Sequence, residues 1–383
     1  MRNKKWRGFL LACVMIGSVI LGGGEAVKVQ ASGVEEAWAD TFGARAVVEG
    51  TQVSFGPITM EMPENFIIED KSAAEPTFYN VDRLTDDVIP MITFSMNSFT
   101  AVTSDSGENQ RAFEEALSKN LGEQGISLDE IKSYEETELE AYKVIRGEYL
   151  CSTGGVQLFC KAYEIYEKLD EMGNSVLIEY YGKAEDTESQ QAAETAFNTI
   201  GLLTGSYEKG SLVSMVSPWE MQFNVQNEVN GTQISFDGTT VTYGPLQMEL
   251  PAGYTQSTNE GEDTMFYAPD GSENFSFSYE NDSFYLYKDV ETMENLLQQS
   301  YAQNGFTVDV TDSQIMDVSG YNAVLATAIV SSPEVSMQQN IVLIFEDVDE
   351  LMSPVITIYH TGDGSEESVL STVDAWNSMR ITE

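Results

Sequence analysis

The feature that most constrains this chain is an internal repeat. A tryptophan, a phenylalanine and a six-residue run return at a constant offset of 181 residues, as Trp38/Trp219, Phe42/Phe223 and 50–55/231–236. A coincidence of this length without a gap is improbable in unrelated segments, so the chain holds two copies of one module. Two copies are too few for a stacked solenoid, which needs at least about three repeats.

The repeat continues at a larger offset. Residues 53–66 match residues 241–254 at an offset of 188, with six of fourteen positions identical and a shared Gly-Pro pair. The step from 181 to 188 predicts a seven-residue insertion in the second copy, at residues 237–240 and their neighbours, because loops absorb added residues at little cost. We therefore predict modules at residues 32–212 and 213–383.

Both copies show the same order of apolar patterns. Alternating apolar residues predict strands, and apolar residues at helical spacing, as at Phe113, Leu117 and Leu121, predict a helix that ends at Gly125. The apolar parity switches at Gly56-Pro57, which predicts a tight turn or a bulge. The order in each module is β-β-β-α-β-β-β-α. The sequence thus predicts an α+β fold of two tandem modules, each an antiparallel sheet with helices packed against it.

The first 31 residues have the composition of an export signal. Four basic residues precede an apolar run from Phe9 to Leu21, and small residues surround Ala31. The run is shorter than the roughly 18 apolar residues that span a bilayer. We predict a signal peptide at residues 1–31, cleavage after Ala31, and a secreted protein that has no membrane contact after cleavage. A lipoprotein processing site at Cys13 is the alternative.

Acidic residues dominate the composition. The chain has 62 Asp and Glu residues against 19 Lys and Arg residues, a net charge of −43. This charge repels nucleic acid and anionic lipid, so neither is expected as a partner, whereas a basic face on a partner is favoured. Residues 53–205 hold 10 basic residues, but residues 241–383 hold only Lys288 and Arg380. The second module can therefore pair few of its acids internally.

Two cysteines follow the signal peptide, Cys151 and Cys160, in a segment that reads as a β-hairpin. Their parity places both side chains on one face of the hairpin, and cysteine pairs outside the cytoplasm commonly form disulfides. We therefore predict a disulfide between them, and the alternative is two reduced, partly buried thiols. The second copy has Val330 and Gln339 at these positions.

The order of elements resembles the PsbP-like fold, a family that includes PsbP, a Ran-binding adaptor and LpqN-type lipoproteins. The resemblance lies in a strand that ends in Pro and an aromatic residue, a small residue plus Tyr before the central hairpin, and an aromatic residue in the last helix. These residues are Pro63 to Phe66, Pro251 to Tyr254, Ala141-Tyr142, Gly320-Tyr321, Phe197 and Trp376. The resemblance implies a non-catalytic adaptor or binding role, by analogy of fold alone.

The sequence has few of the groups that catalysis and metal binding use. The only histidine, His360, ends an expected strand, and we align it with Tyr181 of the first copy. Neither a cysteine cluster nor a nucleotide-binding glycine loop is present. We therefore predict no catalytic residue, no metal ligand and no cofactor.

The leading hypothesis is an exported, non-catalytic binding or adaptor protein with two homologous modules and an extracellular protein or glycan as its partner. A carboxylate pair could instead serve an extracellular hydrolase. The aromatic residues Phe275, Phe277 and Tyr279 could form the platform of a carbohydrate-binding module, although we interpret them as a core-facing row. Two close carboxylates in a cleft would favour the hydrolase.

Overall fold

The structure is a computed structural model that describes residues 33–382 except 72, 205, 208–216, 260, 303 and 304. The chain divides into two compact units, Met1–Ser214 and Met215–Glu383. The predicted signal peptide, its cleavage site after Ala31 and the predicted junction at residues 212 and 213 lie outside the described residues. No helix in the described part of the chain is long and apolar enough to cross a membrane.

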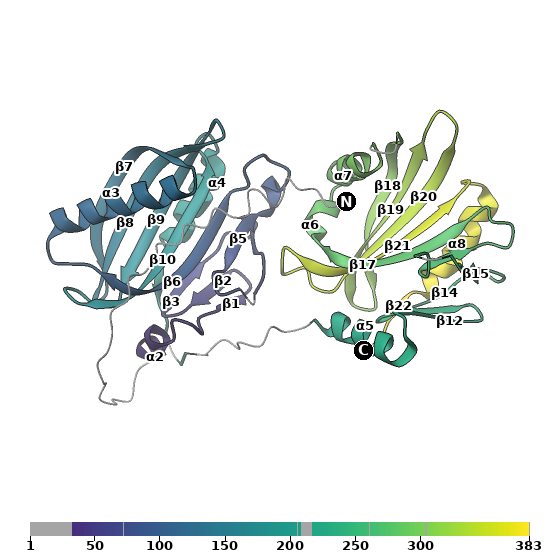
Figure 1. Ribbon diagram of the computed structural model, residues 1–383, viewed down its shortest axis with the longest axis horizontal. Helices are drawn as coiled ribbons and strands as arrows, with labels where there is room; N and C mark the ends of the chain where they lie inside the picture. The colour runs from purple at the N-terminus through teal and green to yellow at the C-terminus, as the bar shows by residue number, and fades with distance from the viewer. Residues whose placement is uncertain are drawn as a thin grey trace. The chain divides into compact units, whose positions relative to one another are not determined.

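The first unit has two antiparallel sheets (Figure 1). The small sheet has the order β1-β2-β3-β11, and the large sheet has the order β4-β5-β6-β10-β9-β8-β7. The strands are β1 (Ala46–Glu49), β2 (Gln52–Phe55), β3 (Ile58–Glu61), β4 (Phe66–Ile68), β5 (Thr77–Asn80), β6 (Met91–Ala101), β7 (Ser127–Leu139), β8 (Tyr142–Thr153), β9 (Val156–Tyr166), β10 (Met172–Lys183) and β11 (Gly201–Leu202). The helices are α2 (Gly33–Ala39), η1 (Val81–Arg83), α3 (Ser106–Glu123) and α4 (Thr187–Phe197).

The second unit repeats this arrangement. Its small sheet has the order β12-β13-β14-β22, and its large sheet has the order β15-β16-β17-β21-β20-β19-β18. The strands are β12 (Ile234–Asp237), β13 (Thr240–Tyr243), β14 (Leu246–Glu249), β15 (Thr255–Gln256), β16 (Met265–Tyr267), β17 (Asn274–Asp282), β18 (Thr307–Val318), β19 (Tyr321–Ser331), β20 (Ser336–Phe345), β21 (Ser353–Gly362) and β22 (Arg380–Ile381). The helices are α5 (Pro218–Asn230), α6 (Phe284–Tyr287), α7 (Val290–Ala302) and α8 (Glu366–Ser378).

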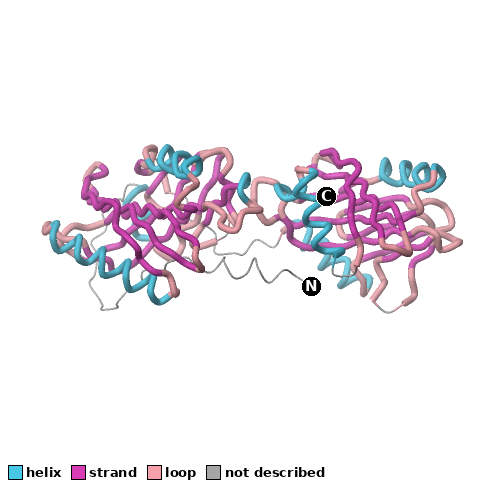
Figure 2. The backbone as a smooth tube through the Cα atoms, turned by 90° about the horizontal axis from the view of Figure 1, so that it is seen from above, coloured by secondary structure: helices cyan, strands magenta, loops and turns pink. Residues whose placement is uncertain are grey.

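The large sheet is the middle layer of each unit. One of its faces packs against the small sheet, the lead helix and the last helix, and these layers enclose an apolar core that includes Trp38 in the first unit and Trp219 in the second. The other face carries a separate apolar cluster beneath α3 or α7. Figure 2 shows the helices of each unit lying outside its strands. The predicted fold class, an α+β fold of two modules with antiparallel sheets and packed helices, is confirmed.

The Gly-Pro pairs form tight turns between strands. Phe55 pairs with Ile58 across Gly56-Pro57, so these two residues alone connect β2 to β3. Gly56 has φ +53° and Gly244 of the second unit has φ +54°, values that favour glycine because it has no Cβ. Of the two predicted alternatives, the turn is therefore the correct one.

The structure adds strands to the predicted order. The longest additions are β7 and β18, which form an edge of each large sheet directly after the long helix. Most of their side chains are exposed or half-buried, and bulges interrupt their pairing after Leu128, Ile131 and Val310. A bulge reverses which face the following side chains occupy, so the sequence shows no clean apolar alternation.

The register corrects the predicted position of the insertion. Ala46 pairs with Phe55, and Ile234 pairs with Tyr243, so β1 corresponds to β12 and β2 to β13, both at an offset of 188. The seven additional residues therefore do not lie at residues 237–240. They lie between Trp219 and β12, where the second unit continues as the helix α5. The apparent match of residues 50–55 with 231–236 is not an equivalence in the structure.

Candidate functional site

An apolar groove follows the outer face of α5. It has a volume of about 570 Å³ and lies between the helix and the adjoining residues of β12, β13 and the turn after β13. Met221, Val225 and Val229 stand four residues apart along one face of the helix and are 51%, 59% and 76% exposed. The remaining lining residues are Pro218, Gln222, Gln226, Ser235, Thr242 and Gly244. An exposed apolar stripe beside a groove is a feature of binding surfaces.

Local sequence signals begin and end α5. The Ser217 hydroxyl accepts a hydrogen bond from the Glu220 backbone N–H, and Pro218 occupies the first helical turn, where a missing N–H costs nothing. The helix ends at Gly231, which adopts the left-handed conformation with φ +71°. These capping signals are present in the sequence, but the internal repeat alone predicts no helix for this segment.

The inner face of α5 fixes the helix on the core. Trp219 and Phe223 are each 1% exposed, and the Phe223 ring lies 4.2 Å from Tyr279 and 4.8 Å from Tyr243. Gln226 adds two hydrogen bonds, because its Nε2 donates to the Thr242 carbonyl and its Oε1 accepts from the Gly244 N–H. The helix is thus held from one side, and the apolar stripe on the other side is left exposed.

The described residues of the first unit show no equivalent of this stripe. Its tryptophan makes the matching contact, since Trp38 lies 5.6 Å from Tyr142 as Trp219 lies 5.1 Å from Tyr321. However, α2 ends at Ala39, and Phe42 is 85% exposed. Phe42 and Phe223 therefore match in the sequence, but Phe42 lies on the surface of the first unit and Phe223 lies in the core of the second.

Two buried carboxyl groups of the first unit lie on the face of the large sheet that α3 covers. Glu164 accepts hydrogen bonds from the hydroxyls of Tyr166 (2.6 Å) and Ser175 (2.7 Å), and burial raises its pKa. Glu179 accepts a hydrogen bond from the Tyr149 hydroxyl at 3.5 Å, and burial raises its pKa to about 8. Both side chains are enclosed, so they do not form the open carboxylate pair that a hydrolase would use.

The same face of the second unit is mostly apolar. The strand registers make Glu164 equivalent to Leu343 and Glu179 equivalent to Tyr359. Burying a carboxyl group costs more than burying an apolar side chain, and groups with strongly shifted pKa values occur more often at functional sites. Here the shifts accompany a closed core, and we assign these carboxyls no role in binding.

The two cysteines of the first unit also lie on the face of its large sheet that α3 covers. Cys151 pairs with Leu158 and Cys160 with Tyr149, so the cysteines are diagonal neighbours in the hairpin and not directly opposed. Their Sγ atoms are 3.4 Å apart, both are free thiols in the structure, and both are buried. A disulfide requires the sulfurs to approach to about 2.05 Å. The disulfide stays a prediction.

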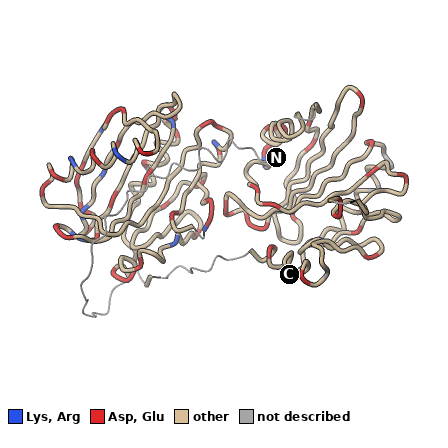
Figure 3. Tube along the Cα trace, in the orientation of Figure 1, with Lys and Arg blue, Asp and Glu red and all other residues tan. Residues whose placement is uncertain are grey.

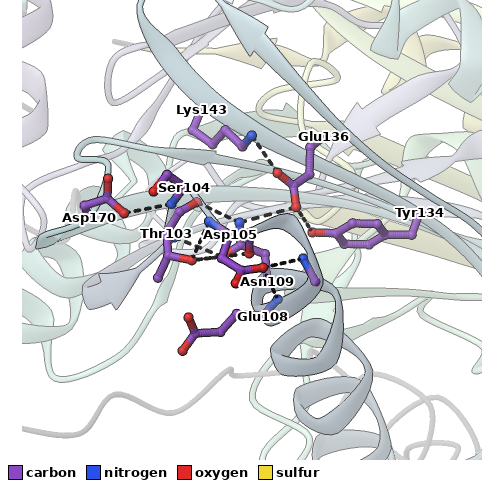
Figure 4. A network of polar contacts seen from close by, with 10 residues as sticks. Thr103, Ser104, Asp105, Glu108, Asn109, Tyr134, Glu136, Lys143 and Asp170 are labelled. Atoms are coloured by element: carbon purple, nitrogen blue, oxygen red, sulfur yellow. Dashed lines mark hydrogen bonds and ion pairs between the residues drawn. The ribbon is translucent and has the colours of Figure 1, made fainter.

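A polar network anchors the first turn of α3 to β7 (Figure 4). The Glu136 carboxylate accepts hydrogen bonds from the Tyr134 hydroxyl at 2.6 Å and from Asn109 Nδ2 at 3.3 Å, and it forms an ion pair with Lys143 at 2.6 Å. Burial raises the pKa of Glu136, but these partners outweigh burial and lower the pKa to about 2. Asp105 caps the helix by accepting from the N–H of Glu108. We interpret the network as structural.

His360 is a core residue of the second unit. It is 1% exposed, its Nδ1 lies 3.4 Å from Asn340 Nδ2, and its Nε2 lies 3.4 Å from a carboxylate oxygen of Glu273. Burial lowers the pKa of His360, and the hydrogen bond to Glu273 opposes this effect. His360 pairs with Asn340 across the sheet as Tyr180 pairs with Lys161, so its counterpart is Tyr180 and the predicted equivalence to Tyr181 is wrong.

The aromatic row of β17 faces the core. Phe275 and Phe277 are buried, and Phe275 packs against His360 and Trp376. The row therefore offers no open platform for sugar rings. Within the residues that the structure describes, no group of three or more His, Cys, Asp and Glu side chains is placed to hold a metal ion.

Comparisons with known proteins bear on the fold. No protein-family model and no curated protein matches this chain. Among solved structures, PsbP from Synechocystis is 10% identical, covers 36% of this chain and 86% of its own, and has a TM-score of 0.28. LpqN from Mycobacterium tuberculosis is 11% identical. The match covers 42% of this chain and 91% of LpqN, with a TM-score of 0.29.

The immunity protein TplEi from Pseudomonas aeruginosa, solved with a peptide, is 11% identical, covers 89% of this chain and 99% of its own, and has a TM-score of 0.23. The two proteins to which the sequence resemblance pointed, PsbP and LpqN, are thus among the structures similar to this chain. This likeness concerns the fold alone, and at these TM-scores it carries no argument about function.

Proposed function

We propose that this chain is an exported, non-catalytic binding protein that engages a protein partner through the α5 groove of its second unit. The observation that carries the proposal is the exposed stripe of Met221, Val225 and Val229 beside that groove. Apolar side chains of this size are usually turned inward, and a contiguous exposed set marks an interaction surface.

The composition of the groove supports binding without chemistry. Among the described residues that line it there is no acid, base or thiol, and the polar ones are two amides and two hydroxyls. No aromatic ring is among these described lining residues, so they offer no flat face on which a sugar ring could stack. A protein partner therefore fits the groove better than a glycan does. Export rests on the composition of residues 1–31.

The proposal can be tested by capture from the native extracellular mixture with the whole chain as bait. A Val225→Glu bait places a charge in the groove, and an Asn227→Glu bait places the same charge on an exposed position of α5 outside the groove lining. We expect a partner that the wild-type and Asn227→Glu baits retain and the Val225→Glu bait loses. Equal capture by all three baits would remove the groove from the proposal.

A further inference from the structure

We propose that the occupant of the α5 groove is a basic amphipathic helix of the partner protein. This inference rests on the function proposed above and specifies its partner. Two features of the described residues carry it, namely the spacing of the exposed apolar residues and the sign of the charges around them.

The spacing of the stripe matches a helical occupant. Met221, Val225 and Val229 are four residues apart, so they form one ridge on the surface of α5. From Met221 to Val229 this ridge is about 12 Å long, at 1.5 Å per residue. Ridges of this kind pack against a second helix that carries its own apolar residues three and four positions apart. Across from the ridge the groove is lined by Ser235 and Thr242, whose small side chains share one face of the small sheet, and by the backbone of Gly244.

The charge around the groove is acidic. Glu228 follows Val225 by three residues, so it lies beside the stripe, and it is exposed. Asp237 follows Ser235 by two residues in β12, so it lies on the same face of the strand as a lining residue, and it too is exposed. No Lys or Arg is among the described residues that line the groove. Arg380 shares the face of the small sheet with Ser235 and Thr242, but it lies two strands beyond Thr242, where it donates hydrogen bonds to Gln247. Residues 241–383 hold only two basic residues against 24 acids. Figure 3 shows acidic positions throughout the second unit.

Charge also distinguishes among occupants. A second copy of this chain would bring another net charge of −43 to the interface, and like charges across an interface oppose association. A helix with Lys or Arg beside its apolar face instead meets Glu228 and Asp237 with the opposite sign. The observations therefore favour a basic partner over self-association.

The test uses the whole chain and synthetic helical peptides. The probe is a Leu/Lys peptide of about 14 residues with Leu at the a and d positions of two heptads. One control peptide has the same residues in scrambled order, and another has Glu in place of Lys. We expect the Leu/Lys peptide alone to bind with measurable affinity, and we expect Val225→Glu to weaken binding by at least about tenfold while Asn227→Glu changes it by less than about twofold.

Val229→Glu serves as a second variant, because Val229 is 76% exposed and a charge there leaves the fold intact. The inference is overturned if the scrambled peptide binds as tightly as the Leu/Lys peptide. It is also overturned if the Val225→Glu and Val229→Glu chains bind the Leu/Lys peptide as tightly as the wild-type chain does. Self-association of the wild-type chain that Val225→Glu abolishes would identify a second copy as the occupant and would also overturn it. If captured partners depend on Val225 but the Leu/Lys peptide does not bind, the inference fails and the proposed function stands.

Discussion

The two units share a fold but differ in the lead helix and in the face of the large sheet that α3 or α7 covers. Both pack a tryptophan from the lead helix against the tyrosine that begins the central hairpin, Trp38 on Tyr142 and Trp219 on Tyr321. After this tryptophan, α5 continues for about three further turns and carries an exposed apolar stripe, whereas α2 ends at Ala39. The first unit buries two carboxyls and two thiols where the second has Leu343, Tyr359, Val330 and Gln339. The two units thus keep the same fold while their lead helices and some of their buried residues differ.

The difference in the lead segment should produce the largest effect. Phe223→Ala removes a core ring, and we expect the free energy of unfolding of the second unit to fall by about 3–5 kcal/mol. Phe42→Ala removes a ring that is already in solvent, and we expect a change below about 0.5 kcal/mol in the first unit. Calorimetry of the whole chain measures both variants. Equal losses would show that the two positions are equivalent after all.

The buried carboxyl of Glu179 should make the stability of the first unit depend on pH. Its pKa is raised to about 8 in the folded unit. The neutral form is therefore favoured by the fold, and stability is fully present below the unfolded pKa near 4.5 and falls as the pH rises toward 8. We expect Glu179→Gln to reduce this pH-dependent loss in the free energy of unfolding of the first unit by up to about 4 kcal/mol.

Urea unfolding of the isolated first unit at pH 5 and pH 8 measures the effect of Glu179→Gln. The control is Glu115→Gln, which changes an exposed carboxyl on α3. The expectation is wrong if the wild-type unit and the Glu179→Gln unit lose equal stability over this range. The second unit has Tyr359 at the equivalent position and should show no such loss through this residue.

The cysteine pair provides the next difference between the units. If Cys151 and Cys160 form a disulfide, the closed loop of about ten residues adds about 2–3 kcal/mol to the first unit. Reduction should then lower the melting temperature of the first unit and leave the second unchanged, because the second has Val330 and Gln339 there. Mass spectrometry of alkylated, unreduced native protein that finds both thiols free would contradict the disulfide.

The smallest expected effect concerns net charge. Residues 241–383 have two basic residues for 24 acids, so their acids are largely uncompensated, whereas the first unit has several ion pairs, including Lys143 with Glu136. Salt shortens the reach of like-charge repulsion to roughly 8 Å at physiological ionic strength. We expect the isolated second unit, residues 213–383, to unfold cooperatively and to gain more melting temperature than the first when salt rises. An equal gain in both units would exclude repulsion as the cause.

Much of the fold could be predicted because its signals are local. The apolar spacing in α3 and the positive φ of Gly125 after it agree with the predicted helix, and the Gly154-Gly155 turn agrees with the predicted hairpin. The edge strands β7 and β18 could not be found, because they are largely exposed and bulged. The sequence also could not reveal that Glu164 is buried, since burial depends on how α3 packs against the large sheet.

The groove was missed for a different reason. Trp and Phe recur at the same offset in both copies, and this match suggested that the lead segments were equivalent. The match hid a helix that the capping residues Ser217, Pro218 and Gly231 do indicate. A repeat therefore predicts the common core well, but it conceals an insertion when similar residues occur on both sides of it.

The most direct test of the central claim is a methyl NMR titration of the whole chain with a partner captured from the extracellular mixture. If α5 of the second unit is the binding surface, the methyl resonances of Met221, Val225 and Val229 shift on addition of the partner, and those of the first unit stay unchanged. Shifts confined to the first unit, with the three α5 methyl-bearing residues unaffected, would contradict the account.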